Sequence, residues 1–296
     1  VWCGEKDIRV MDVKLPECKD DGMIIKVNAT SICGTDLHVY THKPAIPTIL
    51  GHEICGTIVE MGKNANKTIK CFTGEMKVGD RINLYPWITC GTCVNCLEYG
   101  VGASGLCENS FVYGLPYEEL GMGGRAVMSS SIEEAPYIKG GFSEYLYILP
   151  GTFIWQDDMP DSIASLLDPM SVAMRTVELA QRTPGVFEDS FNLNSTVLVN
   201  GDGQIGALTA ACARTLGVKN IIISGGRWER LELAKKISGA DCIMNYHDQS
   251  LEERKEIVNS YTNGKGADVI FQCAGTANAF REAISFLKAV GTFVEA

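Results

Sequence analysis

The stretch Val197-Leu-Val-Asn-Gly201-Asp-Gly-Gln-Ile-Gly206 decides how the second half of this chain folds. Its first four residues predict a short buried strand, and the glycines that follow at G-x-G-x-x-G spacing open a helical pattern. In this context the first glycine makes a tight turn, the second lets a pyrophosphate approach the backbone, and the third packs the helix against the sheet. The amides at the start of the helix then face the phosphates. We therefore expect a dinucleotide site that includes Gly201, Gly203, Gln204, Ile205 and Gly206.

The segments on both sides of this motif alternate between strand and helix patterns. Strands are expected at residues 197–200, 221–224, 243–245, 269–272 and 292–294. Helices are expected between them, at residues 205–216, 229–237, 251–261 and 279–287, and a connecting helix precedes them over 161–182. Such alternation is typical of a doubly wound parallel sheet with helices on both faces. The sequence therefore predicts an α/β nucleotide-binding domain of the Rossmann type over residues 161–296.

The second strand of this domain ends in Ser224-Gly-Gly-Arg227, which bears on the choice of dinucleotide. Sites for NAD usually carry an acidic residue here, which binds the ribose hydroxyls. None is present, a bulky negative group fits beside Gly225, and the guanidinium of Arg227 can pair with a 2'-phosphate. The sequence therefore favours NADP over NAD, although Glu229 or a rotated Arg227 would still permit NAD.

The first half of the chain has a different pattern. Short β-rich runs such as 23–27 and 54–59 are broken by glycine, proline and asparagine at close intervals up to about residue 147. This pattern predicts an irregular β domain over residues 1–160. The net charge of -10 disfavours nucleic acids and anionic membranes as partners. No apolar run reaches the roughly 18–20 residues that a membrane span needs, so small molecules are the expected partners.

The 12 cysteines, in a chain without a recognisable secretory signal, indicate metal ligands and buried thiols rather than disulfides, and hence a cytoplasmic protein. Cys90-Gly-Thr-Cys93-Val-Asn-Cys96, with Cys107 further along the same loop, places four thiolates within reach of one tetrahedral ion, which favours zinc. The bacterial ferredoxin motif begins with similar spacing, but its fourth cysteine follows sooner and precedes a proline. An iron–sulfur cluster, a disulfide pair and the absence of any site remain alternatives. A zinc ion saturated by four thiolates would stabilise the loop as a structural site.

A second group of metal-ligand residue types is dispersed along the first half. It comprises Cys33-Gly-Thr-Asp-Leu-His38 and Gly51-His52-Glu53. Catalytic zinc typically takes three protein ligands from separate parts of a fold and leaves a fourth position open for water or substrate. Each segment is weak evidence by itself, because a histidine beside a glycine is more often a structural residue than a ligand.

These two segments, Val78-Gly-Asp-Arg81, the four-cysteine loop and the glycine motif occur in an order that resembles the zinc-containing medium-chain dehydrogenases. The resemblance spans essentially the whole chain. It implies a GroES-like catalytic first domain and two zinc ions per chain. It also implies that Cys33 and His52 bind the catalytic zinc, with Glu53 beside the metal as an alternative ligand.

The resemblance assigns further roles around the catalytic zinc. It points to Asp168 as the third ligand, because relatives carry Cys, Glu or Asp at this place; the alternative is that Asp168 caps a helix ahead of a proline. Asp36 would accept the free ring N–H of His52 and fix its tautomer. Thr35 matches the hydroxyl that contacts the substrate oxygen, and His38 matches the outer end of a proton relay. The alternative for His38 is an exposed surface histidine.

The implied reaction is hydride transfer between NAD(P) and an alcohol or the matching ketone or aldehyde. Gly34 follows the first ligand cysteine as in polyol and secondary-alcohol relatives, which favours a secondary alcohol or polyol over a primary alkanol. The resemblance also implies a homodimer or homotetramer and a closing part of the nucleotide domain beyond Ala296.

Residues 114–139 have no counterpart in the commonest family pattern; they would line the substrate cleft, block an oligomer contact or form a solvated surface loop.

Two other classes of protein are alternatives to an enzyme. A zinc-thiolate redox-regulatory protein would need the four-cysteine loop alone, without Thr35, His38 or a complete glycine motif. A non-catalytic crystallin-like relative would be expected to lack both zinc constellations. The sequence retains all of these features.

Overall fold

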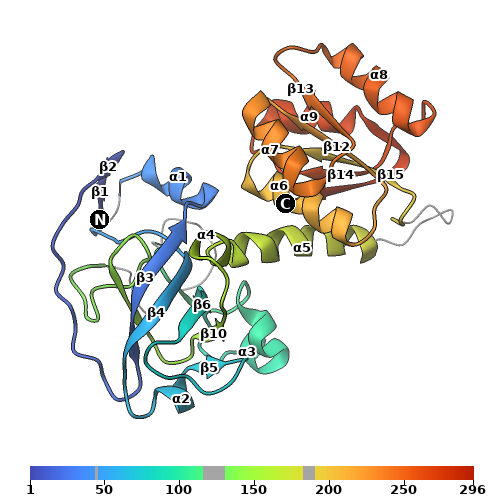
Figure 1. Cartoon of the computed structure of the whole chain (residues 1–296). Helices are drawn as coiled ribbons and strands as arrows, with labels where there is room; N and C mark the ends of the chain where they lie inside the picture. Colours follow the sequence, from blue (N-terminus) through green and yellow to red (C-terminus); the bar gives the residue numbers. More distant parts are fainter. Residues whose placement is uncertain (44–45, 116–130, 183–190) are drawn as a thin grey trace. The chain divides into compact units, whose positions relative to one another are not determined.

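The computed structural model describes residues 1–43, 46–115, 131–182 and 191–296 and divides the chain into two compact units. The first unit spans Val1–Asp168 and the second Pro169–Ala296; both can be followed by colour in Figure 1. Within the described ranges no helix has both the length and the hydropathy that crossing a bilayer requires.

The first unit is built on a six-stranded, mostly antiparallel sheet. In spatial order its strands are β5 (Lys70–Cys71), β10 (Phe153–Gln156), β6 (Arg81–Tyr85), β4 (Glu53–Met61), β3 (Met23–Ser31) and β9 (Tyr145–Ile148). Two small sheets accompany it, β1 (Trp2–Gly4) with β2 (Asp7–Ile8) and β7 (Trp87–Ile88) with β8 (Phe111–Val112). The connections carry α1 (Gly34–Tyr40), α2 (Ala65–Thr68), α3 (Val94–Tyr99), the 3-10 helix η1 (Gly100–Ala103) and α4 (Asp161–Ala164).

The pairing of β3 with β4 matters most for function. The two strands lie side by side in Figure 1, and their register pairs Ser31, the last residue of β3, with Glu53, the first residue of β4. The segment that follows β3 and the segment that precedes β4 therefore leave the sheet at the same end. Buried aliphatic side chains of both strands, among them Ile25 and Ile58, fix this register from the core side.

The second unit is a five-stranded parallel sheet in the order β13-β12-β11-β14-β15. Its strands are β11 (Thr196–Asn200), β12 (Asn220–Gly225), β13 (Cys242–Asn245), β14 (Ala267–Gln272) and β15 (Leu287–Glu295). Its helices are α5 (Leu167–Arg182), α6 (Gln204–Thr215), α7 (Trp228–Ser238), α8 (Leu251–Thr262) and α9 (Ala277–Ile284). Because the order reverses direction beside β11, the glycine motif lies at the switch point where doubly wound sheets bind their ligands.

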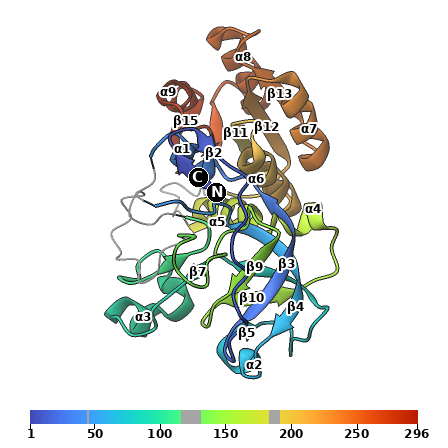
Figure 2. The same ribbon diagram turned by 90° about the vertical axis from the view of Figure 1, so that its left-hand side faces the viewer.

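The central strands are buried on both faces, as parallel sheets require. Val197 and Val199 of β11 pack with α5, α6 and α7, whereas Leu198 between them packs with residues of α8 and α9. Figure 2 shows α7 and α9 on opposite sides of this sheet. The predicted doubly wound architecture is thus confirmed, and each predicted strand lies within or overlaps an observed one.

Two predicted helices are wrong in extent. The helix expected over 161–182 is interrupted, and α4 ends at Ala164 before α5 begins at Leu167. Pro169 explains the break, because a proline without an N–H is tolerated in the first turn of a helix and not in its interior. The helix expected over 279–287 ends at Ile284, since Leu287 instead pairs with Ala267 at the start of β15.

Candidate active site

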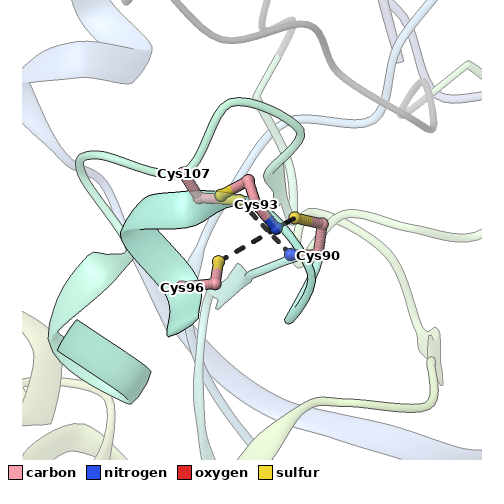
Figure 3. Close-up of side chains that lie close together, drawn as sticks. All are labelled: Cys90, Cys93, Cys96 and Cys107. Atoms are coloured by element: carbon pink, nitrogen blue, oxygen red, sulfur yellow. Dashed lines mark hydrogen bonds between the residues drawn. The ribbon is translucent and has the colours of Figure 1, made fainter. Parts of the chain in front are cut away.

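The four cysteines of the loop come together around one point. All four sulfurs lie within 4.8 Å of one another, and Figure 3 shows them on α3 and the segments that flank it. The Sγ atoms of Cys90 and Cys96 are 3.9 Å apart, and the Cys90 amide donates to the sulfur of Cys107 at 3.3 Å. None of the chain's cysteines forms a disulfide. The arrangement is therefore a set of four thiols that can surround a tetrahedral ion.

The thiols of this loop have unequal acidities. Hydrogen bonds from the backbone amides of Thr92 and Cys93 lower the pKa of Cys90 to about 6, whereas burial raises the pKa of Cys96 to about 12. A cation that binds sulfur would favour the thiolate form of both. The donor set therefore fits zinc, a metal that takes four thiolates at its structural sites.

Cys33, His52 and Glu53 form a second cluster in the first unit. Their ligand atoms lie within 4.8 Å of one another, and His52 and Glu53 are buried. Cys33 caps α1 just after β3, and His52 precedes β4, so the pairing of these two strands accounts for the convergence. A thiolate, an imidazole and a carboxylate from separate segments are the donors that an open zinc site uses.

Asp36 connects the two segments that carry these donors. Its Oδ2 accepts the backbone N–H of Cys33 at 2.9 Å, and its Oδ1 accepts the N–H of Gly51 at 3.3 Å and lies 3.7 Å from Nδ1 of His52. Asp36 is also half of a capping box at the start of α1. Burial raises the pKa of its carboxyl, and the charge of His52 opposes this rise.

Three further residues were predicted for this site, namely Thr35, His38 and Asp168. The hydroxyl of Thr35 accepts a hydrogen bond from the Cys33 thiol at 3.6 Å, and His38 is exposed at the end of α1, with its ring 4.8 Å from that of His42. Asp168 is not one of the donors within 4.8 Å of one another, although the charge of His52 lowers its pKa against the larger effect of burial. The structure thus brings Glu53, rather than Asp168, into the cluster.

The glycine motif has the geometry that a dinucleotide turn needs. Gly201 has a φ of 138°, and a Cβ on Gly206 would lie 2.0 Å from the carbonyl oxygen of Gly201, so that neither position accepts a side chain. A Cβ on Gly203 would meet no atom within 4 Å. Gln204 and Ile205 open α6, whose first amides face this space. The turn therefore fits the pyrophosphate of a dinucleotide.

Asp202 of the glycine motif contacts the residues that follow β12, and the sequence did not single out this residue. Oδ2 of Asp202 accepts the backbone N–H groups of Gly226 and Arg227 at 3.0 and 2.9 Å, and a Cβ on Gly225 would lie 2.4 Å from the Asp202 Cβ. Arg227 is exposed at the N-cap of α7. The sequence contains one signal for this contact. The glycine motif includes an acidic residue, whereas the second strand ends without one.

The segment at 114–139 lies partly outside the described residues, which omit 116–130. At its ends, Gly114 donates to the carbonyl of Lys139 at 2.9 Å, and Ser131 bridges to Thr48. Both ends are therefore attached to the first unit.

Comparisons with known proteins identify the family to which the chain belongs. Residues 19–158 match the family model of the alcohol dehydrogenase GroES-like domain, and residues 205–296 match that of the zinc-binding dehydrogenase. The chain is 31% identical to L-threonine 3-dehydrogenase of Shewanella sp. (strain ANA-3), over 94% of this chain and 70% of the relative. It is 30% identical to sorbitol dehydrogenase of Bacillus subtilis (strain 168), over 98% and 72%. The chain belongs to the zinc-containing medium-chain alcohol and polyol dehydrogenases.

Solved structures of related dehydrogenases share the fold of both units. An alcohol dehydrogenase from Thermotoga maritima has a TM-score of 0.76 and 26% identity, covering 95% of this chain and 71% of that one. A zinc-binding dehydrogenase from Sinorhizobium meliloti 1021 bound to NADP has a TM-score of 0.72 at 27% identity, with coverages of 98% and 73%. An Escherichia coli alcohol dehydrogenase complexed with NADH has a TM-score of 0.71 at 25% identity, with coverages of 99% and 73%.

Family membership confirms the GroES-like and Rossmann domains and the class of enzyme. This medium-chain dehydrogenase is a zinc-dependent oxidoreductase that acts on alcohols. The redox-regulatory and crystallin-like alternatives are not favoured, since the relatives are named dehydrogenases and the chain carries both donor clusters.

Proposed function

We propose that this dehydrogenase interconverts a secondary alcohol or polyol and the matching ketone or aldehyde, with hydride transfer to or from NAD(P). The observation that carries the proposal is the convergence of Cys33, His52 and Glu53 beside the Thr35 hydroxyl. The named relatives support the substrate class, because threonine at its third carbon and sorbitol both carry a secondary hydroxyl.

Two zinc ions per chain are part of the proposal. The four-cysteine loop offers a closed, structural site, and Cys33, His52 and Glu53 offer an open one, with Asp168 as the alternative to Glu53. When bound at the open site, zinc supplies Lewis acidity that polarises the substrate oxygen and makes an alcohol hydroxyl more acidic.

The chain itself supplies the proton path and the orientation of the donors. The hydroxyl of Thr35 lies 3.6 Å from the Cys33 sulfur, which supports a role for it in taking the proton of an alcohol bound there. His38 lies one turn further along α1 and is exposed, so it can pass that proton to solvent. The buried carboxylate of Asp36 faces His52 and supports the ring tautomer that leaves Nε2 as the donor atom.

The dinucleotide is held by the turn of the second unit. Gly201, Gly203 and Gly206 shape the turn, and the first amides of α6, at Gln204 and Ile205, bind the pyrophosphate. The sequence of β12 favours NADP, on the grounds of Gly225 and Arg227. The related structures contain NADP in one case and NADH in another.

The proposal extends to the assembly and the location of the enzyme. A homodimer or homotetramer is expected from the family resemblance, and size-exclusion chromatography with light scattering would test it. A cytoplasmic location is supported by the free thiols of all the cysteines, which a reducing compartment maintains.

The decisive experiment is a panel of secondary alcohols, polyols and primary alkanols offered with NAD and with NADP, before and after removal of metal by a chelator. We expect reduction of a dinucleotide by secondary alcohols or polyols, and its loss with the chelator. Turnover of primary alkanols alone would overturn the substrate class, and turnover that survives complete loss of zinc would overturn the mechanism.

A further inference from the structure

The turn between β12 and α7 already binds a carboxylate of the chain itself. Oδ2 of Asp202 accepts hydrogen bonds from two successive amides, those of Gly226 and Arg227, at 3.0 and 2.9 Å. Successive amides that point the same way at a helix start are a binding site for an anion. Here the site is filled from within the glycine motif.

The space beside Gly225, which the sequence suggests is open, is also filled. A Cβ on Gly225 would lie 2.4 Å from the Cβ of Asp202 and 2.7 Å from its Oδ2. Gly225 is thus a glycine because the Asp202 side chain passes over it. The room beside Gly225, which the sequence assigned to a 2'-phosphate, is occupied by a carboxylate.

Tyr246 also contacts this turn. A Cβ on Gly226 would lie 2.3 Å from the hydroxyl of Tyr246, and the Tyr246 amide donates to the carbonyl of Gly225 at 3.0 Å. Because both Tyr246 and Asp202 contact the turn, its conformation keeps the two amides directed at the carboxylate. A 2'-phosphate would have to displace Asp202 or lie beside its negative charge.

We propose that Asp202 is the residue that selects the dinucleotide and that this dehydrogenase uses NAD. The inference rests on the proposed function, and it reverses the preference for NADP that the sequence suggests. In doubly wound domains the end of the second strand lies at the adenosine ribose, where NAD sites provide a carboxylate acceptor for the ribose hydroxyls. Asp202 supplies that carboxylate from the first strand's turn and repels a phosphate at the same position.

The test measures binding rather than turnover. Dissociation constants of NADH and NADPH, and of 5'-AMP and 2',5'-ADP, would be measured by calorimetry for the full chain and for Asp202→Asn and Asp202→Ala. Glu232→Gln is the matched control, because it removes an exposed negative charge from α7 without touching the turn. Melting temperatures would establish that each variant is folded.

We expect the parent to bind NADH at least about tenfold more tightly than NADPH, and both Asp202 variants to shift this ratio about tenfold toward NADPH. Glu232→Gln should leave the ratio unchanged. A parent that binds NADPH as tightly as NADH would overturn the inference, whatever the variants do, and so would a ratio that neither Asp202 variant changes. A chain that binds neither dinucleotide would overturn the proposed function as well, which separates the two failures.

Discussion

The carboxylate of Asp36 lies 3.7 Å from Nδ1 of His52, and both groups are buried in the first unit. The same carboxylate accepts the amides of Cys33 and Gly51. Among the described residues, Nδ1 of His52 has no hydrogen-bond partner, because 3.7 Å exceeds the length of a hydrogen bond. We therefore expect the His52 ring to turn its Nδ1 toward Asp36 when the other ring nitrogen binds a metal.

Asp36→Asn should therefore weaken the catalytic zinc, and its melting temperature would establish that the variant is folded. The amide retains the shape and one acceptor oxygen, but it lacks the charge that supports the His52 tautomer. Loss of such a partner typically costs 10–100-fold in metal affinity or activity, on the order of 2 kcal/mol. Chelator competition would measure the affinity. The exposed Asp20→Asn, which removes the partner of Lys63, serves as the control, and equal zinc affinity in the two variants would contradict the role of Asp36.

Cys33→Ser and His52→Ala should separate catalysis from structure. Each removes one of the converging donors, so each variant should contain one zinc ion per chain and oxidise alcohols at least about 1000-fold more slowly. Their four-cysteine loops should remain loaded, because no residue is shared between the clusters. Metal analysis by mass spectrometry, together with initial rates, checks both statements. Folded variants that retained the parent's rate would refute the assignment of these donors.

Cys96→Ser should lower stability, in contrast to the two variants of the catalytic cluster. Cys96 and Cys107 are buried, and the loop around them packs mainly on its own cysteines and Ala103. A loop with so small a core depends on its metal, so loss of one donor should lower the melting temperature and expose residues 90–107 to protease. Each 1 kcal/mol corresponds to about 2–4 °C for a domain of this size.

Cys3→Ser is the control for this variant, since Cys3 lies outside both clusters. If Cys96→Ser kept two zinc ions and the melting temperature of the parent, the loop would not be a metal site.

The order of elements in the second unit could be predicted because strand and helix periods are local properties of the sequence. The end of α9 cannot be predicted in this way, because the apolar residues Ile284 and Leu287 fit either period. Leu287 belongs to a strand because it pairs with Ala267, a residue that is distant in the sequence.

The candidate site was predictable only in part. The four-cysteine loop follows from spacing, whereas Cys33 and His52 meet through the pairing of Ser31 with Glu53, which no local pattern reveals. Their roles came from the family resemblance. The contact of Asp202 was unpredictable for another reason, since its partners, the amides of Gly226 and Arg227, lie 24 and 25 residues further along the chain.

Two glycines of the motif should respond differently to alanine. In Gly206→Ala the new Cβ would lie 2.0 Å from the Gly201 carbonyl oxygen, a backbone atom, so we expect a loss of about 3 kcal/mol in the free energy of unfolding. In Gly203→Ala the Cβ meets no atom within 4 Å, and the backbone, at φ -80° and ψ -175°, accepts alanine. That variant should have the same free energy of unfolding as the parent.

The Cβ of Gly203→Ala would nevertheless project into the space before α6, where the pyrophosphate is expected. We therefore expect its dissociation constant for the preferred dinucleotide to rise about tenfold, a change of 1.4 kcal/mol. Urea denaturation and calorimetry measure the two quantities separately. Unchanged binding by a folded Gly203→Ala would place the pyrophosphate elsewhere, because a methyl group at the second glycine cannot be accommodated beside a phosphate that contacts its backbone.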